Sequence, residues 1–300
     1  MKRLTIFFVI LGFALTALYF SQRRTERTPV SANALLNMAA DAQRDLARAP
    51  MRLTHISDAE EIRIGDELAG HYAMQTQKLT AEEQGLEKYI MRVGSTVGVH
   101  AHRRLPYRFH LLPDRALFNA FSLPGGHVYI GRGLVDLLTT EDELANILAH
   151  EVEHIDHYHC AERVQVDARL KKLRLDAVGA LLQIPLELWE TGYHKDEEME
   201  ADREGMHLAV LSGYSPYGAV SVFERLAKLH KEYVIHAESP EQELSELAIQ
   251  SMTGYFRSHP LPSERLALAN NLIAQEHWEN RKTQRPFRVE YEVHNGEYVN

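Results

Sequence analysis

A pair of histidines four residues apart is the feature of this sequence best suited to chemistry. The segment His150-Glu-Val-Glu-His154 lies in a stretch whose apolar residues recur at helical spacing. Side chains four apart are separated by about 40° around a helix, so both imidazoles can bind one metal ion. Glu151 can take a proton from a water on that metal without being a ligand. The pattern predicts metal-assisted hydrolysis with Glu151 as general base.

Zinc suits these donors best, because it accepts three protein ligands plus a water and lowers the pKa of that water to about 7. We therefore expect one Zn²⁺ per chain. The alternative is a pair of solvated histidines on a charged helix face, which a chain with 17 histidines leaves open. A metzincin site would require glycine and histidine at positions 157 and 160, and the sequence has His157 and Cys160 there.

A third ligand is expected from a second helix, predicted over residues 196–212. Glu198, Asp202 and Gly205 lie at i, i+4 and i+7 and share one face of that helix. Glu198 can bind the metal, Asp202 can accept a hydrogen bond from the second nitrogen of a ligand histidine, and Gly205 permits close helix contact. An acidic helix start also complements the helix dipole, which is the alternative reading of these carboxylates.

The elements that must position these residues are mainly helical, with one small antiparallel β-sheet. Capping patterns at Ser57–Glu60 and Thr140–Glu143 mark two helix starts. Alternating apolar residues and the turn Pro124–Gly126 predict the sheet. The predicted strands cover residues 107–112, 116–123 and 127–131. The other helices are predicted from Ile56 and over 81–97, 140–164, 165–190, 196–212, 217–235 and 263–274.

The chain divides into four predicted regions. Residues 1–21 form a signal-anchor helix, since Lys2 and Arg3 precede a 17-residue apolar run; a removed signal peptide is the alternative. Residues 22–55 form a polar tether. Residues 56–276 form the domain that carries the predicted metal site. Residues 277–300 form an extension with a hairpin around Asn295-Gly296.

Composition narrows the class of protein. The chain has 300 residues, 45% of them apolar and 25% charged, which is typical of a folded domain. Its single cysteine excludes an intramolecular disulfide. The net charge of −9, without a stripe rich in lysine and arginine, argues against nucleic acid as a partner. The expected partners are a polypeptide substrate and, through the N-terminal helix, a membrane.

Five blocks in order resemble the gluzincin zinc metallopeptidases of HtpX, the CAAX prenyl proteases and the BepA-type periplasmic protease-chaperones. The BepA-type branch is the most similar, because this chain has one hydrophobic span. The resemblance covers residues 57 to 275. The matching blocks are Asn119–Gly126, Glu143-Leu-Ala with His150–His154, Glu198–Asp202, Gly213–Pro216 and His259–Arg265.

The resemblance implies a gluzincin-like metallopeptidase domain with Glu198 as third metal ligand and Asp202 beside the ligand histidines. It also implies that His259 enters as a fourth ligand and closes the open metal position; a loop histidine before a proline is the alternative. Arg265 either pairs with substrate or an oxyanion, or forms a structural ion pair.

The same resemblance places Asn119 and the strand His127, Val128, Tyr129 and Ile130 beside the substrate cleft. A peptide is expected to add to that strand through main-chain hydrogen bonds.

The expected function is a membrane-anchored zinc metalloendopeptidase with its catalytic domain on the extracytoplasmic side. By resemblance, its substrates are misfolded or misassembled cell-envelope proteins. One alternative is a tethered chaperone or assembly factor whose zinc site is kept closed. Another is a metal-binding module without hydrolysis.

Overall fold

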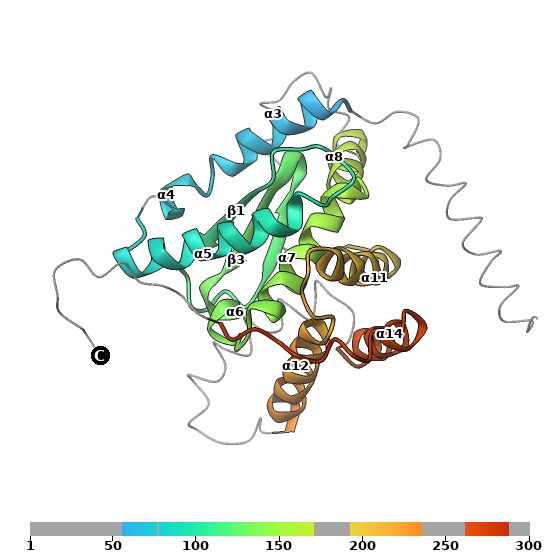
Figure 1. Cartoon of the computed structure of the whole chain (residues 1–300). Helices are drawn as coiled ribbons and strands as arrows, with labels where there is room; N and C mark the ends of the chain where they lie inside the picture. The colour runs from blue at the N-terminus through green and yellow to red at the C-terminus, as the bar shows by residue number, and fades with distance from the viewer. Residues whose placement is uncertain (1–55, 77, 171–192, 236–261, 288–300) are drawn as a thin grey trace, which may run out of the picture. The chain divides into compact units, whose positions relative to one another are not determined.

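The computed structural model describes residues 56–76, 78–170, 193–235 and 262–287, which include most of the predicted metallopeptidase domain and the first part of the predicted extension. Helices surround a small sheet (Figure 1). Among the described residues, no helix combines the length and the apolar character of a membrane span. The helices are α3 (Asp58–Ala69), α4 (Ala73–Thr76), α5 (Ala81–Gly98), α6 (Arg132–Asp136), α7 (Glu141–Asp156), α8 (His159–Leu170), α11 (Lys195–Leu211), α12 (Tyr217–Ile235) and α14 (Pro262–Gln275).

Several predictions fall outside the part of the chain that the structure describes. These are the anchor and tether of residues 1–55, most of the predicted helix 165–190, His259, and the hairpin from residue 288 onward. They remain predictions.

Helix starts follow the capping signals of the sequence. The Thr140 hydroxyl accepts a hydrogen bond from the Glu143 main-chain N–H, and the Glu143 carboxylate accepts one from the Thr140 N–H. The same reciprocal pair, Thr80 with Glu83, begins α5. At α3, Ser57 Oγ accepts from the Glu60 N–H at 3.3 Å. These bonds satisfy main-chain donors that the first helical turn leaves unpaired.

The predicted helix over residues 140–164 is wrong in one respect, because the chain breaks between α7 and α8. α7 ends at Asp156, and Tyr158 adopts a left-handed conformation with φ 64°. The Asp156 carboxylate accepts a hydrogen bond of 2.6 Å from the Arg103 main-chain N–H. The Arg103 guanidinium lies 3.8 Å above the Tyr158 ring. Contacts from a distant loop therefore fix the break, and local sequence carries no signal of it.

The sheet contains β1 (Arg108–Leu112), β2 (Ala120–Leu123) and β3 (His127–Gly131), in the order β1-β3-β2. β2 and β3 are antiparallel, as predicted, and a short 3-10 turn, η1 (Pro124–Gly126), joins them. β1 pairs with β3 in parallel, so the small sheet is mixed and not antiparallel throughout. Strand directions alternate along the chain as expected, but β3 lies between β1 and β2 in the sheet.

Two glycines permit this strand order. The segment between β1 and β2 passes close to the end of β3, where a Cβ on Gly131 would lie 2.2 Å from the Leu117 carbonyl oxygen. A Cβ on Gly133 would lie 2.4 Å from the Arg115 carbonyl oxygen. Only glycine tolerates backbone approach at these distances. The crossing places β2 at one edge of the sheet, against α7.

The second helical layer brings α11 against α7 (Figure 1). A Cβ on Gly205 of α11 would lie 2.9 Å from Cα and from the main-chain N of His150. α12 packs against α7 and α14, and α14 also contacts α11. The helices predicted over 196–212, 217–235 and 263–274 are confirmed to within one residue. Gly205 thus sets the separation of the two helices that carry the predicted ligands.

Replacing Gly205 with alanine tests this close approach. In an ordinary helix the change would stabilise the protein by up to about 1 kcal/mol. Here the added methyl group would meet the backbone of α7, and overpacking of this kind costs about 1–3 kcal/mol. We expect Gly205→Ala to lower the free energy of unfolding, measured by urea denaturation. Arg203→Ala, at an exposed position of the same helix, is the control. An equally stable Gly205→Ala protein would contradict the account.

Candidate metal centre

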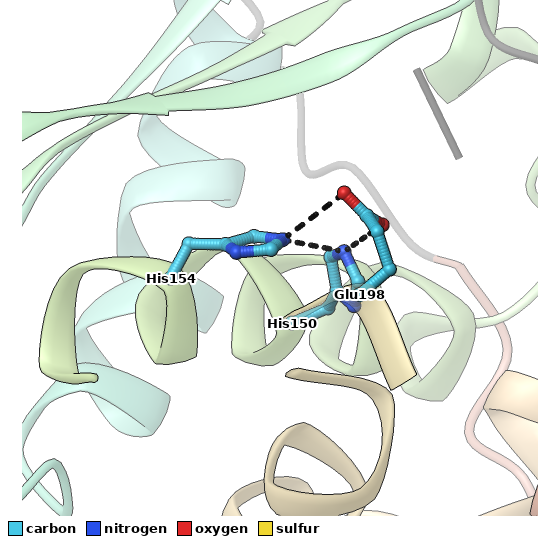
Figure 2. A group of neighbouring side chains, drawn as sticks. All are labelled: His150, His154 and Glu198. Carbon is cyan, nitrogen blue, oxygen red and sulfur yellow. Dashed lines mark hydrogen bonds and ion pairs between the residues drawn. The ribbon is translucent and has the colours of Figure 1, made fainter. Parts of the chain in front are cut away.

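The three predicted ligands converge on one buried point. His150 and His154 project from α7, and Glu198 projects from the first turn of α11 (Figure 2). The two Nε2 atoms lie 3.1 Å apart. The Glu198 carboxylate oxygens lie 3.4 Å from His150 Nε2 and 3.6 Å from His154 Nε2. All three residues are buried, and His154 and Glu198 have no exposed surface. The structure therefore brings the predicted ligand set together.

This donor set fits a tetrahedral zinc ion. A zinc with bonds of about 2.0–2.1 Å to nitrogen and oxygen holds its ligand atoms about 3.3 Å apart. The three separations in the cluster, 3.1 to 3.6 Å, bracket that value. Two buried imidazole nitrogens and a buried carboxylate oxygen at these distances form a set of donors that could hold a metal ion.

The second nitrogen of His150 is held by a buried ion pair. His150 Nδ1 lies 2.9 Å from Asp202 Oδ1. Arg265 binds both oxygens of Asp202, with Nε at 2.7 Å and Nη2 at 2.5 Å. Arg265 therefore forms an ion pair, one of its two predicted roles, and the predicted contact with substrate or an oxyanion stays a prediction. The arrangement fixes the His150 ring with Nε2 directed at the cluster.

The ion pair and its hydrogen bonds shift the pKa values of His150 and Asp202. Burial alone would lower the pKa of His150, but hydrogen bonds with Asp202 and Glu198 outweigh it and raise the pKa to about 9. Burial would raise the pKa of Asp202, but the Arg265 guanidinium and the hydrogen bonds lower it. Asp202 therefore stays ionised. A metal at the cluster would displace the proton from His150 Nε2.

Glu151, the predicted general base, is buried beside the cluster. Its Oε2 accepts a hydrogen bond of 2.9 Å from Ser122 Oγ on β2. Ser122 lies within the block that carries the family resemblance, but it was not among the predicted site residues. The antiparallel pairing of β2 with β3 places its hydroxyl on the face of the sheet that meets α7.

A pocket opens beside His150 and Glu151. Most of its wall is apolar and comes from α6, α7, α11 and α12. Its polar lining includes His150 and Glu151. The apolar side chains that line it are Ala120, Leu134, Ile147, Met206, Ala219, Val222 and Phe223.

The predicted peptide addition to the strand His127, Val128, Tyr129 and Ile130 is wrong. That strand is β3, which pairs with β1 on one side and β2 on the other. Its main-chain groups are therefore used within the sheet. β2 is the edge strand next to the cavity, and its residue Ala120 lines it.

Asn119 stands just before β2 and is buried. Its carbonyl oxygen accepts a hydrogen bond of 2.9 Å from the Gly131 N–H. Within the described part of the chain, its side-chain oxygen has no hydrogen-bond partner. Asn119 is not among the residues that line the cavity. From this stretch, Ser122 rather than Asn119 contacts the predicted catalytic residues.

The outer side of His154 has two neighbours that the sequence did not indicate. The Tyr193 ring stacks on the imidazole with centroids 3.9 Å apart, and the Tyr193 N–H donates to Glu198 Oε1 at 3.1 Å. His159 Nδ1 lies 2.9 Å from His154 Nδ1. A stacked ring and a second histidine therefore surround this ligand.

Comparison with known proteins identifies the family. Residues 80–273, more than half of the chain, match the model of Peptidase family M48. The chain belongs to this family. It is 28% identical over 208 residues to a protein of Yersinia pestis named beta-barrel assembly-enhancing protease, covering 63% of this chain and 39% of that protein. It is 24% identical over 214 residues to metalloprotease LoiP of Escherichia coli, covering 67% of this chain and 80% of that protein.

A third relative is the mitochondrial metalloendopeptidase OMA1 of Arabidopsis thaliana, 27% identical over 175 residues, covering 54% of this chain and 36% of that protein. These findings confirm the predictions of a metallopeptidase and of similarity to the BepA-type branch. The chain spans less than half of the length of the beta-barrel assembly-enhancing proteases that it matches.

The Asp202–Arg265 pair should be essential to stability. Arg265→Leu would leave the buried Asp202 carboxylate with the His150 imidazole but without its guanidinium partner, and removing one member of a buried ion pair typically costs about 3–5 kcal/mol. Arg115→Leu is the matched control, because Arg115 pairs with Asp136 at the surface and exposed pairs contribute at most about 1 kcal/mol. Urea unfolding of both variants measures the difference. Equal losses would contradict the structural role given to Arg265.

Proposed function

We propose that this chain is a zinc-dependent endopeptidase whose metal is held by His150 Nε2, His154 Nε2 and the Glu198 carboxylate. The observation that carries the proposal is the convergence of these three donors at spacings that suit tetrahedral zinc. Membership in peptidase family M48 supports the reaction class. We propose one Zn²⁺ per chain.

Bound zinc would supply Lewis-acid polarisation of the scissile carbonyl and of the attacking water. Glu151 takes a proton from that water as it attacks and returns the proton to the amine that leaves. The Ser122 hydroxyl orients the Glu151 carboxylate through the bond to Oε2. The Asp202–Arg265 pair holds the His150 ring, so the ligand geometry is formed before substrate arrives.

Replacing Glu151 with glutamine tests the proposed base. We expect Glu151→Gln to retain zinc and to lose about 100- to 10,000-fold in the rate of casein cleavage, the usual contribution of a general base. Glu153→Gln, at the other glutamate of the motif, is the matched control, because Glu153 contacts His157 rather than Ser122. Metal analysis and cleavage rates are measured on the same preparations. Full activity in the Glu151 variant with zinc bound would refute the assignment.

The substrate is proposed to be an extended polypeptide with an apolar side chain next to the scissile bond. The edge strand β2 offers a place for a peptide to pair by main-chain hydrogen bonds. The apolar cavity beside Glu151 offers a site for one side chain of that peptide. We propose that misfolded or misassembled envelope proteins, which expose such segments, are the physiological substrates.

Filling the cavity should change side-chain preference. Ala219 is a buried residue of its wall, and Ala219→Leu would occupy space that a leucine or phenylalanine of the substrate uses. For peptides that differ beside the scissile bond, we expect kcat/KM for the large apolar residues to fall about tenfold or more, since pocket fit of this kind contributes 10- to 200-fold. The alanine peptide is the internal control. An unchanged preference would show that the cavity does not receive substrate.

A role as an assembly factor with a zinc site that is kept closed is the second candidate. The name of the Yersinia pestis relative, beta-barrel assembly-enhancing protease, favours it. In this account His259 acts as a fourth ligand, and His259→Ala increases cleavage. Full biological function of Glu151→Gln would favour assembly over proteolysis.

We also propose that residues 1–21 anchor the protein in a membrane, with residues 56–276 on the extracytoplasmic side. The basic residues Lys2 and Arg3 before an apolar run support it. N-terminal sequencing of the mature protein distinguishes an anchor from a removed signal peptide.

A further inference from the structure

The two ligand histidines differ in what holds their second ring nitrogen. His150 Nδ1 faces the buried Asp202 carboxylate at 2.9 Å. His154 Nδ1 instead faces Nδ1 of another imidazole, that of His159, at 2.9 Å. His159 is buried, with 3% of its surface exposed. Its other nitrogen, Nε2, lies 3.5 Å from Glu200 Oε2 on α11. A chain of polar contacts therefore runs from His154 to Glu200.

Metal binding determines which ring nitrogens of His154 and His159 carry a proton. A ligand nitrogen must be bare, so His154 binds metal through Nε2 only when its proton is on Nδ1. His159 Nδ1 must then accept that proton's hydrogen bond. The proton of neutral His159 consequently lies on Nε2, which faces the Glu200 carboxylate. The Glu200 charge favours this one arrangement over the reverse, in which His154 Nε2 would carry the proton and could not bind metal.

The break between α7 and α8 makes the contact possible. His159 follows His154 by five residues, and in a continuous helix their side chains would point about 140° apart. The left-handed Tyr158 redirects the chain so that α8 begins at His159 with its ring against His154. A second contact restrains the His154 ring, because the Tyr193 ring stacks on its face. The ring of His154 is thus held at its edge and on its face.

We infer that His159, anchored by Glu200, is a positioning residue that sets the tautomer and orientation of His154 for metal binding. The inference rests on the proposed zinc site. Groups that hold the second nitrogen of a ligand histidine typically contribute 10- to 100-fold to metal affinity. His159 therefore contacts the second ring nitrogen of His154, just as Asp202 contacts the second ring nitrogen of His150.

Two substitutions at His159 in the full-length chain separate positioning from packing. His159→Phe keeps a buried ring and removes the acceptor, and we expect the zinc dissociation constant to rise about 10- to 100-fold. His159→Gln restores a hydrogen-bond acceptor on a smaller side chain, and we expect affinity near that of the wild type. Zinc affinity is measured by chelator competition. The visible spectrum of the Co²⁺-substituted proteins reports ligand geometry independently of activity.

His157→Phe is the matched control. His157 also approaches Glu200, at 3.8 Å, but its Nε2 contacts Glu153 rather than a ligand histidine. Its zinc affinity should equal that of the wild type. Glu200→Gln keeps the shape of the anchor and removes its charge, so it should weaken zinc binding severalfold and provides the test if His159→Phe does not fold.

Wild-type zinc affinity and an unchanged Co²⁺ spectrum in His159→Phe, or in Glu200→Gln if the former does not fold, would overturn the inference. Failure of His159→Gln to restore affinity lost in His159→Phe would overturn it as well. A wild-type chain that binds no zinc would instead refute the proposed function, so the two failures are distinguishable.

Discussion

The close contact between α7 and α11 is the constraint on which the site depends. A carboxylate on one helix must reach two imidazoles on another within the span of a single ion, so the backbones must approach closely. Gly205 removes the Cβ that would meet the His150 backbone 2.9 Å away. The Asp202–Arg265 pair then joins α11 to α14 and to the His150 ring. Backbone approach and buried charge pairing together bring Glu198 to the histidines.

Each of the two buried carboxylates of α11 near this contact has cationic or hydrogen-bonding partners. Asp202 is paired with a guanidinium, and Glu198 faces two imidazoles and a main-chain N–H. An unpaired carboxylate at such depth would cost several kcal/mol or take up a proton. The two histidine Nε2 atoms and the Glu198 carboxylate converge on one place. A metal ion there would take the place of the His150 proton, and these donors form a set that could hold such an ion.

Local signals in the sequence predicted most of the helices and the ligands. Reciprocal caps such as Thr140 with Glu143 depend on residues three apart, and the histidine motif depends on residues four apart, so both can be found without a structure. Glu198 and Asp202 required the further assumption that two helices meet. The distances to His150 agree with that assumption.

Features set by distant contacts were missed. The break at Tyr158 depends on Arg103, and the central place of β3 depends on a loop that passes over Gly131. Periodicity predicted the alternating strand directions but not the order of the strands in the sheet. The family resemblance assigned peptide pairing to residues 127–130, and these form the inner strand. Ser122 could have been suspected from its place in a family-like block, since a strand alternates its faces. His159 could not, because helical spacing placed it away from His154.

Zinc K-edge X-ray absorption of the zinc-loaded full-length protein would test the metal centre most directly. The account predicts one zinc per chain, with two imidazoles and oxygen donors at about 2.0–2.2 Å. Absence of stoichiometric zinc, a sulfur ligand, or a coordination shell without two imidazoles would contradict it.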